Sequence, residues 1–274
     1  MMNAGELRLE SASFSRDGGR DYNEDAVGDS DAFGAVRLFM LADGAGGQGG
    51  GDVAAQTAIA AARAEFMRMP AFSPDTLRRC ISSADLAVRQ KQVKETRLSR
   101  MASTFVAILV DYRQRQALIG NLGDSRCYVF RSAQVIGQSY DHSLVQRFID
   151  AGLYPAERLR EHPKRNVLYA SLGANEESVE PFVSETPIAL LPGDGILLCS
   201  DGVWELIDDA TLGKLHAMSP NVAVWRDHLV AAVRGRMAPG HDNFSALLVR
   251  CTLSALDADE DDQRTMPPMS LQVA

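Results

Sequence analysis

The chain has 274 residues, 46% of them hydrophobic, which suffices for one large globular domain or two small ones. Its net charge of −8 argues against general binding to nucleic acids or acidic membranes. No apolar run reaches membrane-spanning length, and residues 1–19 hold no apolar signal segment. Four cysteines are scattered without a CxxC pair or zinc-ligand spacing, so we expect buried, reduced thiols in a cytoplasmic protein.

The first part of the chain is predicted to form strands and a pair of helices. Residues 7–14 alternate apolar and polar side chains, as a half-buried strand does, and residues 36–42 form an apolar run of strand length. Between them, residues 16–26 are rich in turn-forming residues and carboxylates. Helical patterns follow at residues 54–69 and 75–93, separated by two prolines.

Residues 91–100 are polar and net basic. The interpretation that we favour is a solvated helix end followed by a loop. The alternative is a basic patch that steers an anionic substrate.

The remaining chain predicts further strands, interrupted by helices. Strands are predicted at residues 104–110, 117–121, 127–131, 188–190, 196–200 and 244–251, and helices at 143–151, 209–217 and 221–235. Residues 154–170 look irregular. No repeat or linker divides the chain, so residues 1–254 predict one layered α+β domain. Residues 255–274 form an acidic tail without apolar periodicity, which we expect to be disordered.

Residues 36–55 carry a strong functional signal. Asp43 ends the predicted strand, and six of the eight residues 44–51 are glycine. Residues 44–49 fit the GxGxxG pattern of a dinucleotide-binding loop between a strand and a helix. Against that hypothesis, Asp43 would face the pyrophosphate, and Glu65, the candidate ribose ligand, falls inside a helical pattern. No P-loop lysine follows the glycines.

Asp43 belongs to a set of acids near predicted strand ends and strand starts. The set comprises Asp43, Asp124, Asp201 and Asp242, with Glu24 and Asp25 in the earlier acidic segment. Any one of them alone is more often a turn or cap residue. Clustered carboxylates repel one another unless protons or cations lie between them. An all-oxygen ligand set suits Mg²⁺ or Mn²⁺.

Five motifs, in order, give these acids a family context: RDYNEDA, LADGAGGQGG, GDSR, CSDGVWELI and HDNFSALLV. Together they resemble the PP2C-type (PPM) metal-dependent serine/threonine protein phosphatases of bacteria. The similarity runs from about residue 14 to residue 249, nearly the whole chain before the tail. It implies a four-layer α-β-β-α sandwich, in which two stacked antiparallel sheets are flanked by helix pairs.

The resemblance also implies a metal centre. It would hold two Mn²⁺ or Mg²⁺ ions, with a third, weaker ion seen in bacterial members. The implied ligands are Asp43 bridging the two main ions together with the Gly44 carbonyl, Asp201 and Asp242 on the first ion, Glu24 and Asp25 on the second, partly through water, and Asp124 with Asp201 on the third.

The implied reaction is hydrolysis of phosphoserine and phosphothreonine in proteins by a metal-activated water. Arg20 and Asp43 would be its catalytic residues, with the planar guanidinium of Arg20 gripping the substrate phosphate. Asn243 would orient Asp242 or a water at the metals. The expected partners are phosphoproteins and the bacterial Ser/Thr kinase whose action the enzyme reverses, with no nucleic acid and no membrane.

Other positions qualify this assignment. Ala45 stands where many family members have His or Met, which removes one candidate general acid. Residues 152–165 fall where the family has a variable flap near the cleft. His142 and His162 are candidates for proton transfer, whereas Trp204, Trp225 and Arg126 are predicted to be structural. Besides the dinucleotide-binding oxidoreductase, a catalytically silent relative remains an alternative, although the intact acids argue against it.

Overall fold

The computed structural model describes residues 7–30, 32–45, 50–94, 96–174 and 180–253. The acidic tail predicted at residues 255–274 and the central glycines at 46–49 lie outside the described residues, so the predicted disorder of the tail stays a prediction.

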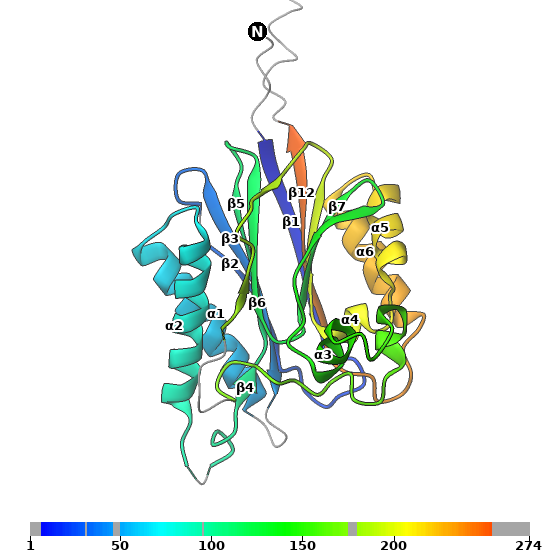
Figure 1. The fold of residues 1–274 in the computed structure, drawn as a ribbon. Helices are drawn as coiled ribbons and strands as arrows, with labels where there is room; N and C mark the ends of the chain where they lie inside the picture. The colour runs from blue at the N-terminus through cyan, green and yellow to red at the C-terminus, as the bar shows by residue number, and fades with distance from the viewer. Residues whose placement is uncertain (1–6, 31, 46–49, 95, 175–179, 254–274) are drawn as a thin grey trace, which may run out of the picture.

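Two antiparallel sheets stack face to face at the centre of the molecule (Figure 1). One has the strand order β1 (Leu7–Arg16), β12 (Phe244–Leu253), β11 (Gly195–Cys199), β7 (Arg126–Arg131) and β8 (Gln134–Gln138). The other has the order β10 (Ile188–Ala189), β6 (Gln116–Leu122), β5 (Phe105–Asp111), β3 (Val36–Ala45) and β2 (Asp25–Asp29). Two short strands join this second sheet: β4 (Ala102–Ser103) beside β3, and β9 (Phe182–Val183) beside β6.

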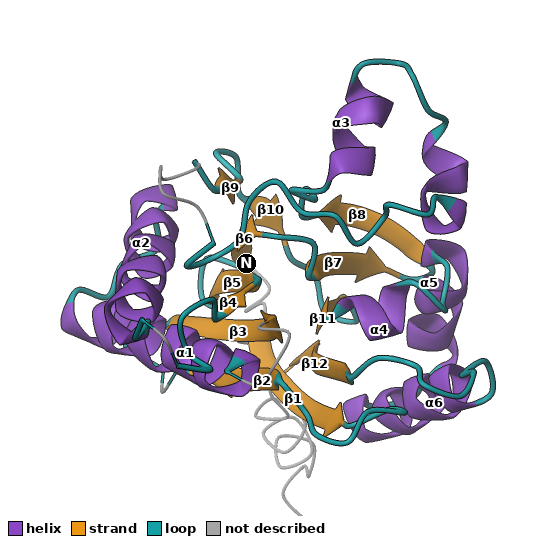
Figure 2. Ribbon diagram, turned by 90° about the horizontal axis from the view of Figure 1, so that it is seen from below, coloured by secondary structure: helices purple, strands orange, loops and turns teal. Residues whose placement is uncertain are grey.

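Helices cover both outer faces, so the predicted four-layer sandwich is confirmed (Figures 1 and 2). The sheet that contains β3 is covered by α1 (Gly51–Arg68) and α2 (Pro74–Lys91). The other sheet is covered by α5 (Asp209–Met218) and α6 (Val222–Arg234). Three short helices complete the fold: α3 (Leu144–Asp150), η1 (Ala156–Glu161) and α4 (Asp201–Trp204).

Strand β3 shows how the layers are held together. Leu38 and Met40 pack toward α1 and α2, whereas Phe39 and Leu41 point into the core between the sheets. Because both faces of the strand are covered, its residues 38–42 form a continuous apolar run and do not alternate with polar residues. These four side chains are fully buried, and burying each one stabilises the folded state by roughly 1.5–3 kcal/mol.

Several elements differ from the predictions. Strand β3 continues to Ala45, so Asp43 lies within the strand and not at its end. Helix α1 begins at Gly51, three residues before the predicted start. Strands β2 and β8 and the 3-10 helix η1 were not predicted. All four cysteines are buried and free, as predicted.

Candidate active site

The predicted acids come together at one end of the sandwich. Asp25 and Asp43 lie directly opposite each other in the pairing of β2 with β3. Asp201 follows β11, Asp242 precedes β12, and Asp124 lies in the turn between β6 and β7. The last residue of β11 pairs with the first residue of β7 and the third residue of β12, so these strand termini share one edge. The fold therefore gathers acids that are up to 217 residues apart in the numbering, from 25 to 242.

Asp43 is at the centre of this charge cluster. Burial raises its pKa well above the usual value, and the carboxylates of Asp25, Asp201, Asp124 and Asp242 raise it further. Burial is also the main reason that the pKa of Asp201 is raised well above its usual value, followed by repulsion from Asp124. Such carboxylates favour a bound proton or a bound cation over the bare charge.

The pKa values of the neighbouring acids are raised as well. Burial raises the pKa of Asp25 to about 6, although hydrogen bonds from serine hydroxyls oppose it. Burial, followed by repulsion from Asp141, raises the pKa of Asp124 to about 7. The pKa of Glu24 is raised, chiefly by burial. Perturbed carboxyls that share one edge of a fold are a common mark of a functional site.

Two oxygen atoms indicate that a cation fits this cluster. Oδ1 of Asp25 and Oδ1 of Asp201 are both buried, and neither accepts a hydrogen bond. A buried acceptor without a partner costs roughly 1–3 kcal/mol, a cost that an ion would remove. Among the described residues, no three acidic, His or Cys side chains lie close enough together to hold an ion between them. The carboxylates would therefore have to move toward one another to bind one. The donor set is all oxygen, which fits Mg²⁺ or Mn²⁺.

Asn243 holds the loop that carries Arg20 and Glu24. Its side-chain oxygen accepts from the Glu24 amide at 2.9 Å, and its Nδ2 donates to the carbonyls of Asp17 and Tyr22. The resemblance implied that Asn243 orients Asp242 or a water at the metals. Asn243 does contact Asp242 through its main chain, where its amide donates to Asp242 Oδ1 at 2.8 Å.

Arg20 lies beside the acid cluster at the edge of a polar pocket. Its Nη2 donates to Asp242 Oδ2 at 2.8 Å, and both side chains are about half-exposed. The pocket has a volume of about 230 Å³ and is lined by Gly19, Arg20, Asp21, Tyr22, Glu24, Asp242 and Asn243. It thus places one guanidinium next to two of the predicted metal ligands.

Gly44 and Gly51 allow α1 to lie close against β3. A Cβ on Gly44 would overlap the main chain of Gly51, and a Cβ on Gly51 would meet the Glu24 carboxylate. The Gly51 amide, at the start of α1, donates to Glu24 Oε1 at 3.1 Å. In a dinucleotide-binding loop such a helix amide would face a phosphate, but here a carboxylate takes that place. The glycines therefore serve close packing at the acid cluster.

The comparisons with known proteins agree with this arrangement. The sequence matches the family Protein phosphatase 2C over residues 16–227. This chain belongs to the protein phosphatase 2C family. The predicted resemblance and enzyme class are thereby confirmed, against the dinucleotide-binding oxidoreductase.

Bacterial PP2C relatives are similar along almost the whole chain. The serine/threonine phosphatase stp of Listeria monocytogenes is 28% identical over 256 residues, covering 90% of this chain and 98% of the relative. PstP of Mycobacterium tuberculosis is 30% identical, covering 90% of this chain but 48% of that longer protein.

Solved PP2C structures confirm the fold. Stp1 from Staphylococcus aureus superposes with a TM-score of 0.79 at 26% identity, covering 91% of this chain and 97% of Stp1. The catalytic domain of PstP, in complex with two manganese ions, has a TM-score of 0.73 at 29% identity and covers 90% of this chain and 99% of that domain. PP2C phosphatases are metal-dependent, in keeping with the predicted metal requirement.

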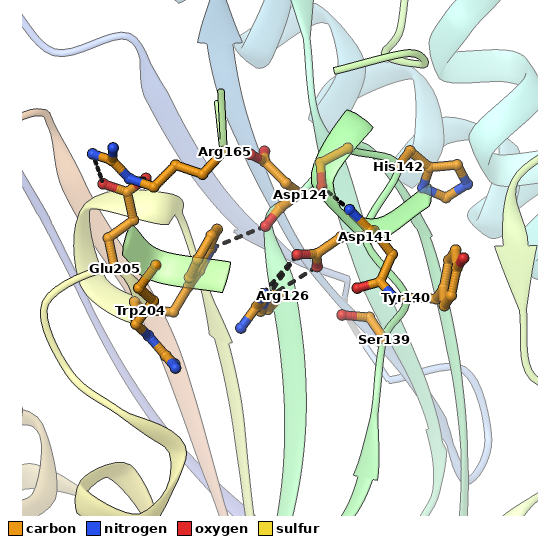
Figure 3. Close-up of polar contacts among 12 residues, drawn as sticks. Asp124, Arg126, Ser139, Tyr140, Asp141, His142, Arg165, Trp204 and Glu205 are labelled. Atoms are coloured by element: carbon orange, nitrogen blue, oxygen red, sulfur yellow. Dashed lines mark hydrogen bonds and ion pairs between the residues drawn. The ribbon is translucent and has the colours of Figure 1, made fainter. Parts of the chain in front are cut away.

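A buried network of polar contacts lies at one edge of the candidate site (Figure 3). The Arg126 guanidinium forms two-pronged hydrogen bonds with Asp141, at 3.0 and 2.6 Å, and stacks 3.7 Å above the Trp204 ring. Trp204 in turn donates from Nε1 to the carbonyl of Asp124 at 2.9 Å. Arg126 and Trp204 are buried, as predicted for structural residues. The sequence did not indicate that Trp204 contacts the turn carrying Asp124.

The predicted flap at residues 152–165 is tied to the same edge. It contains η1, and Arg160 donates from Nε to the Trp204 carbonyl at 2.7 Å. Arg165 pairs with Glu205 at 2.7 Å.

The predicted proton-transfer histidines lie in different surroundings. His142 is buried beside the Gly123 carbonyl, and burial lowers its pKa, whereas His162 packs against Tyr154.

Among the described residues, no helix combines the length and the apolar character needed to span a membrane.

Proposed function

We propose that this PP2C-family chain hydrolyses phosphoserine and phosphothreonine in proteins and releases inorganic phosphate. The observation that carries the proposal is the gathering of Asp25, Asp43, Asp124, Asp201 and Asp242 in one charge cluster beside the Arg20 pocket. The cluster suits divalent cations, and the pocket offers a cationic side chain for a phosphate.

The proposed ligands are those expected from the sequence. Asp43 and the Gly44 carbonyl would hold two Mn²⁺ or Mg²⁺ ions, together with Asp201 and Asp242 for one ion and Glu24 and Asp25 for the other, and Asp124 with Asp201 would hold a third. When bound, such ions lower the pKa of water and neutralise charge on a phosphate. The two unpartnered oxygens, on Asp25 and Asp201, support this assignment.

The chain's own residues have separate tasks in this proposal. Arg20 would leave its contact with Asp242 and bind two phosphate oxygens, as its planar fork permits. Asn243 keeps the Arg20 loop in place through the main chain of residues 17–24. The Ala45 side chain has no titratable proton, so the leaving serine or threonine oxygen would take its proton from water or another side chain.

We further propose the biological setting. The substrates would be cytoplasmic phosphoproteins, and the enzyme would reverse a bacterial Ser/Thr kinase or act on its targets, without a role for nucleic acid or membrane. The names of the relatives, serine/threonine phosphatase stp and PstP, support this class of substrate.

Phosphate release from a phosphothreonine peptide tests the proposed function. We expect hydrolysis with Mn²⁺ and none with EDTA, because without the ions nothing lowers the pKa of the attacking water. The control is the same peptide, unphosphorylated, with enzyme and Mn²⁺. Release that continues in EDTA would contradict metal-dependent hydrolysis. A chain that binds Mn²⁺ without releasing phosphate would instead be a silent relative.

A further inference from the structure

The loop between α2 and β4 runs beside the active site. It leads into β4, which pairs with the end of β3, so that Ser103 lies opposite Gly44. The Ser103 hydroxyl donates to the Asp43 carbonyl at 3.0 Å. A Cβ on Gly50 would lie 2.9 Å from the Arg97 carbonyl, so the loop also touches the turn before α1. Figure 1 shows β4 and the start of α1 at the same end of the sandwich.

This loop is rich in basic residues. Residues 91–100 contain four basic residues and one acid, Glu95, which lies outside the described residues. Lys91 is engaged, donating from Nζ to Thr57 Oγ1 at 3.0 Å. Lys94, Arg97 and Arg100 are exposed, and none makes an ion pair within the described part of the chain. The loop therefore presents a local positive patch in a chain with a net charge of −8.

The main chain of the loop is fixed at both ends. Gln92 donates from Nε2 to the carbonyls of Met101 and Gly173, at 2.9 and 2.8 Å. Met101 is fully buried in the core beneath α1 and α2, and its amide donates to the Leu98 carbonyl. A patch displayed on such an anchored loop loses little conformational entropy when it binds a partner.

We propose that Lys94, Arg97 and Arg100 dock acidic residues that flank the phosphoserine or phosphothreonine of a substrate. This inference rests on the proposed function and specifies its substrate class. An acidic peptide that enters the site meets the carboxylate cluster, and the basic loop beside it offers the compensating charge. A nucleic acid fits less well, because a long polyanion would cross the acids and meet only a short basic patch.

The test compares two phosphothreonine peptides that differ only in their flanks, acidic in one and neutral in the other. The variant is Arg97→Glu with Arg100→Glu. The matched control is Arg8→Glu with Arg113→Glu, two exposed arginines at the other end of the sheets, where β1 begins and β5 turns into β6. A third substrate, p-nitrophenyl phosphate, has no flanks and reports on the chemistry alone.

For the acidic peptide, we expect the loop variant to raise KM about fivefold with kcat unchanged. KM for the neutral peptide and for p-nitrophenyl phosphate stays within about twofold of wild type, and the control variant behaves as wild type. The preference of the wild type for the acidic peptide should fade above about 0.5 M salt. Because that salt series uses unaltered protein, it tests the proposal even if a variant folds poorly.

An equal rise in KM for both peptides, or the same rise in the control variant, would overturn the docking surface. So would competition by single-stranded DNA that is stronger than competition by the unphosphorylated acidic peptide. A wild type that fails to hydrolyse p-nitrophenyl phosphate with Mn²⁺ would instead refute the proposed function. The two failures are thereby distinguished.

Discussion

The indole nitrogen of Trp204 donates a hydrogen bond of 2.9 Å to the main-chain carbonyl of Asp124. Trp204 closes the short helix α4, which begins with Asp201, so this bond joins the turns that carry two proposed metal ligands. The other tryptophan, Trp225, is equally buried but packs against Phe130 and His216, away from the acids.

The two tryptophans allow a matched comparison. Trp204→Phe keeps an aromatic ring but leaves the Asp124 carbonyl without its donor, and a lost buried hydrogen bond costs roughly 1–3 kcal/mol. We expect Mn²⁺ affinity, measured by titration calorimetry, to fall about tenfold in this variant. Trp225→Phe should lower the free energy of unfolding by a similar amount and leave Mn²⁺ affinity unchanged. Equal affinities in the two variants would mean that Trp204 is a core residue only.

Arg20→Ala separates substrate binding from metal binding. Because Arg20 contacts Asp242 through an exposed ion pair, its removal takes little from the fold. We expect KM for a phosphothreonine peptide to rise about tenfold or more, from loss of a two-pronged contact with phosphate, whereas Mn²⁺ affinity does not fall. Arg20→Lys should recover only part of the loss, since an ammonium lacks the planar fork. A variant that loses Mn²⁺ instead would show that Arg20 supports the ligands.

Much of the fold can be predicted from the sequence, because most strands are buried on both faces. Strands β3, β5, β11 and β12 each contain an apolar run that burial on both faces explains. Strand β2, with the sequence DAVGD, has no such run, since all five of its residues are half-buried. It exists through its pairing with β3, a long-range contact that local propensity does not contain.

Asp43→Asn is expected to stabilise the metal-free chain. Since the pKa of Asp43 is raised in the fold, its carboxyl favours folding while protonated, below its unfolded pKa, and that contribution is lost as pH rises through the folded pKa. Burial also raises the pKa of Asp25 to about 6 and that of Asp124 to about 7. The gain in unfolding free energy from Asp43→Asn should therefore be larger at about pH 8 than at about pH 5.

Urea denaturation in EDTA measures this effect. Asp29→Asn is the control, because Asp29 lies on β2, the strand that pairs with β3, but forms an ion pair with Arg37 and not with the acid cluster. It should give no stabilisation at either pH. A variant Asp43→Asn that is less stable than wild type at the higher pH would contradict repulsion within the cluster.

Gly44→Ala tests the close approach of α1 to β3. The added methyl group would overlap the main chain of Gly51, and overpacking of this kind costs roughly 1–3 kcal/mol. Gly235→Ala is the matched control, because its φ of −69° suits alanine and the nearest atom is 3.4 Å from the new Cβ. We expect thermal unfolding to fall by several degrees for Gly44→Ala and to change little for Gly235→Ala. Equal effects would refute a tight contact at Gly44.

The acidic residues of the candidate site could be predicted from the sequence, but the hydrogen bonds that hold the surrounding loops could not. Asp43, Asp201 and Asp242 stand next to apolar runs, which marks their positions in the chain. The bonds from Asn243 to the loop at residues 17–24, and from Trp204 to Asp124, join segments that are distant in sequence. No local pattern encodes such contacts, because they arise only when the strand ends meet.

The most direct measurement counts bound Mn²⁺ per chain and phosphate release in the same samples, for wild type, Asp43→Asn and Asp201→Asn. We expect the wild type to bind at least two ions and to hydrolyse a phosphothreonine peptide. Each variant should lose both metal and activity, because each removes a charged oxygen ligand from the cluster. Full metal binding and full activity in Asp43→Asn would contradict a carboxylate-held metal centre.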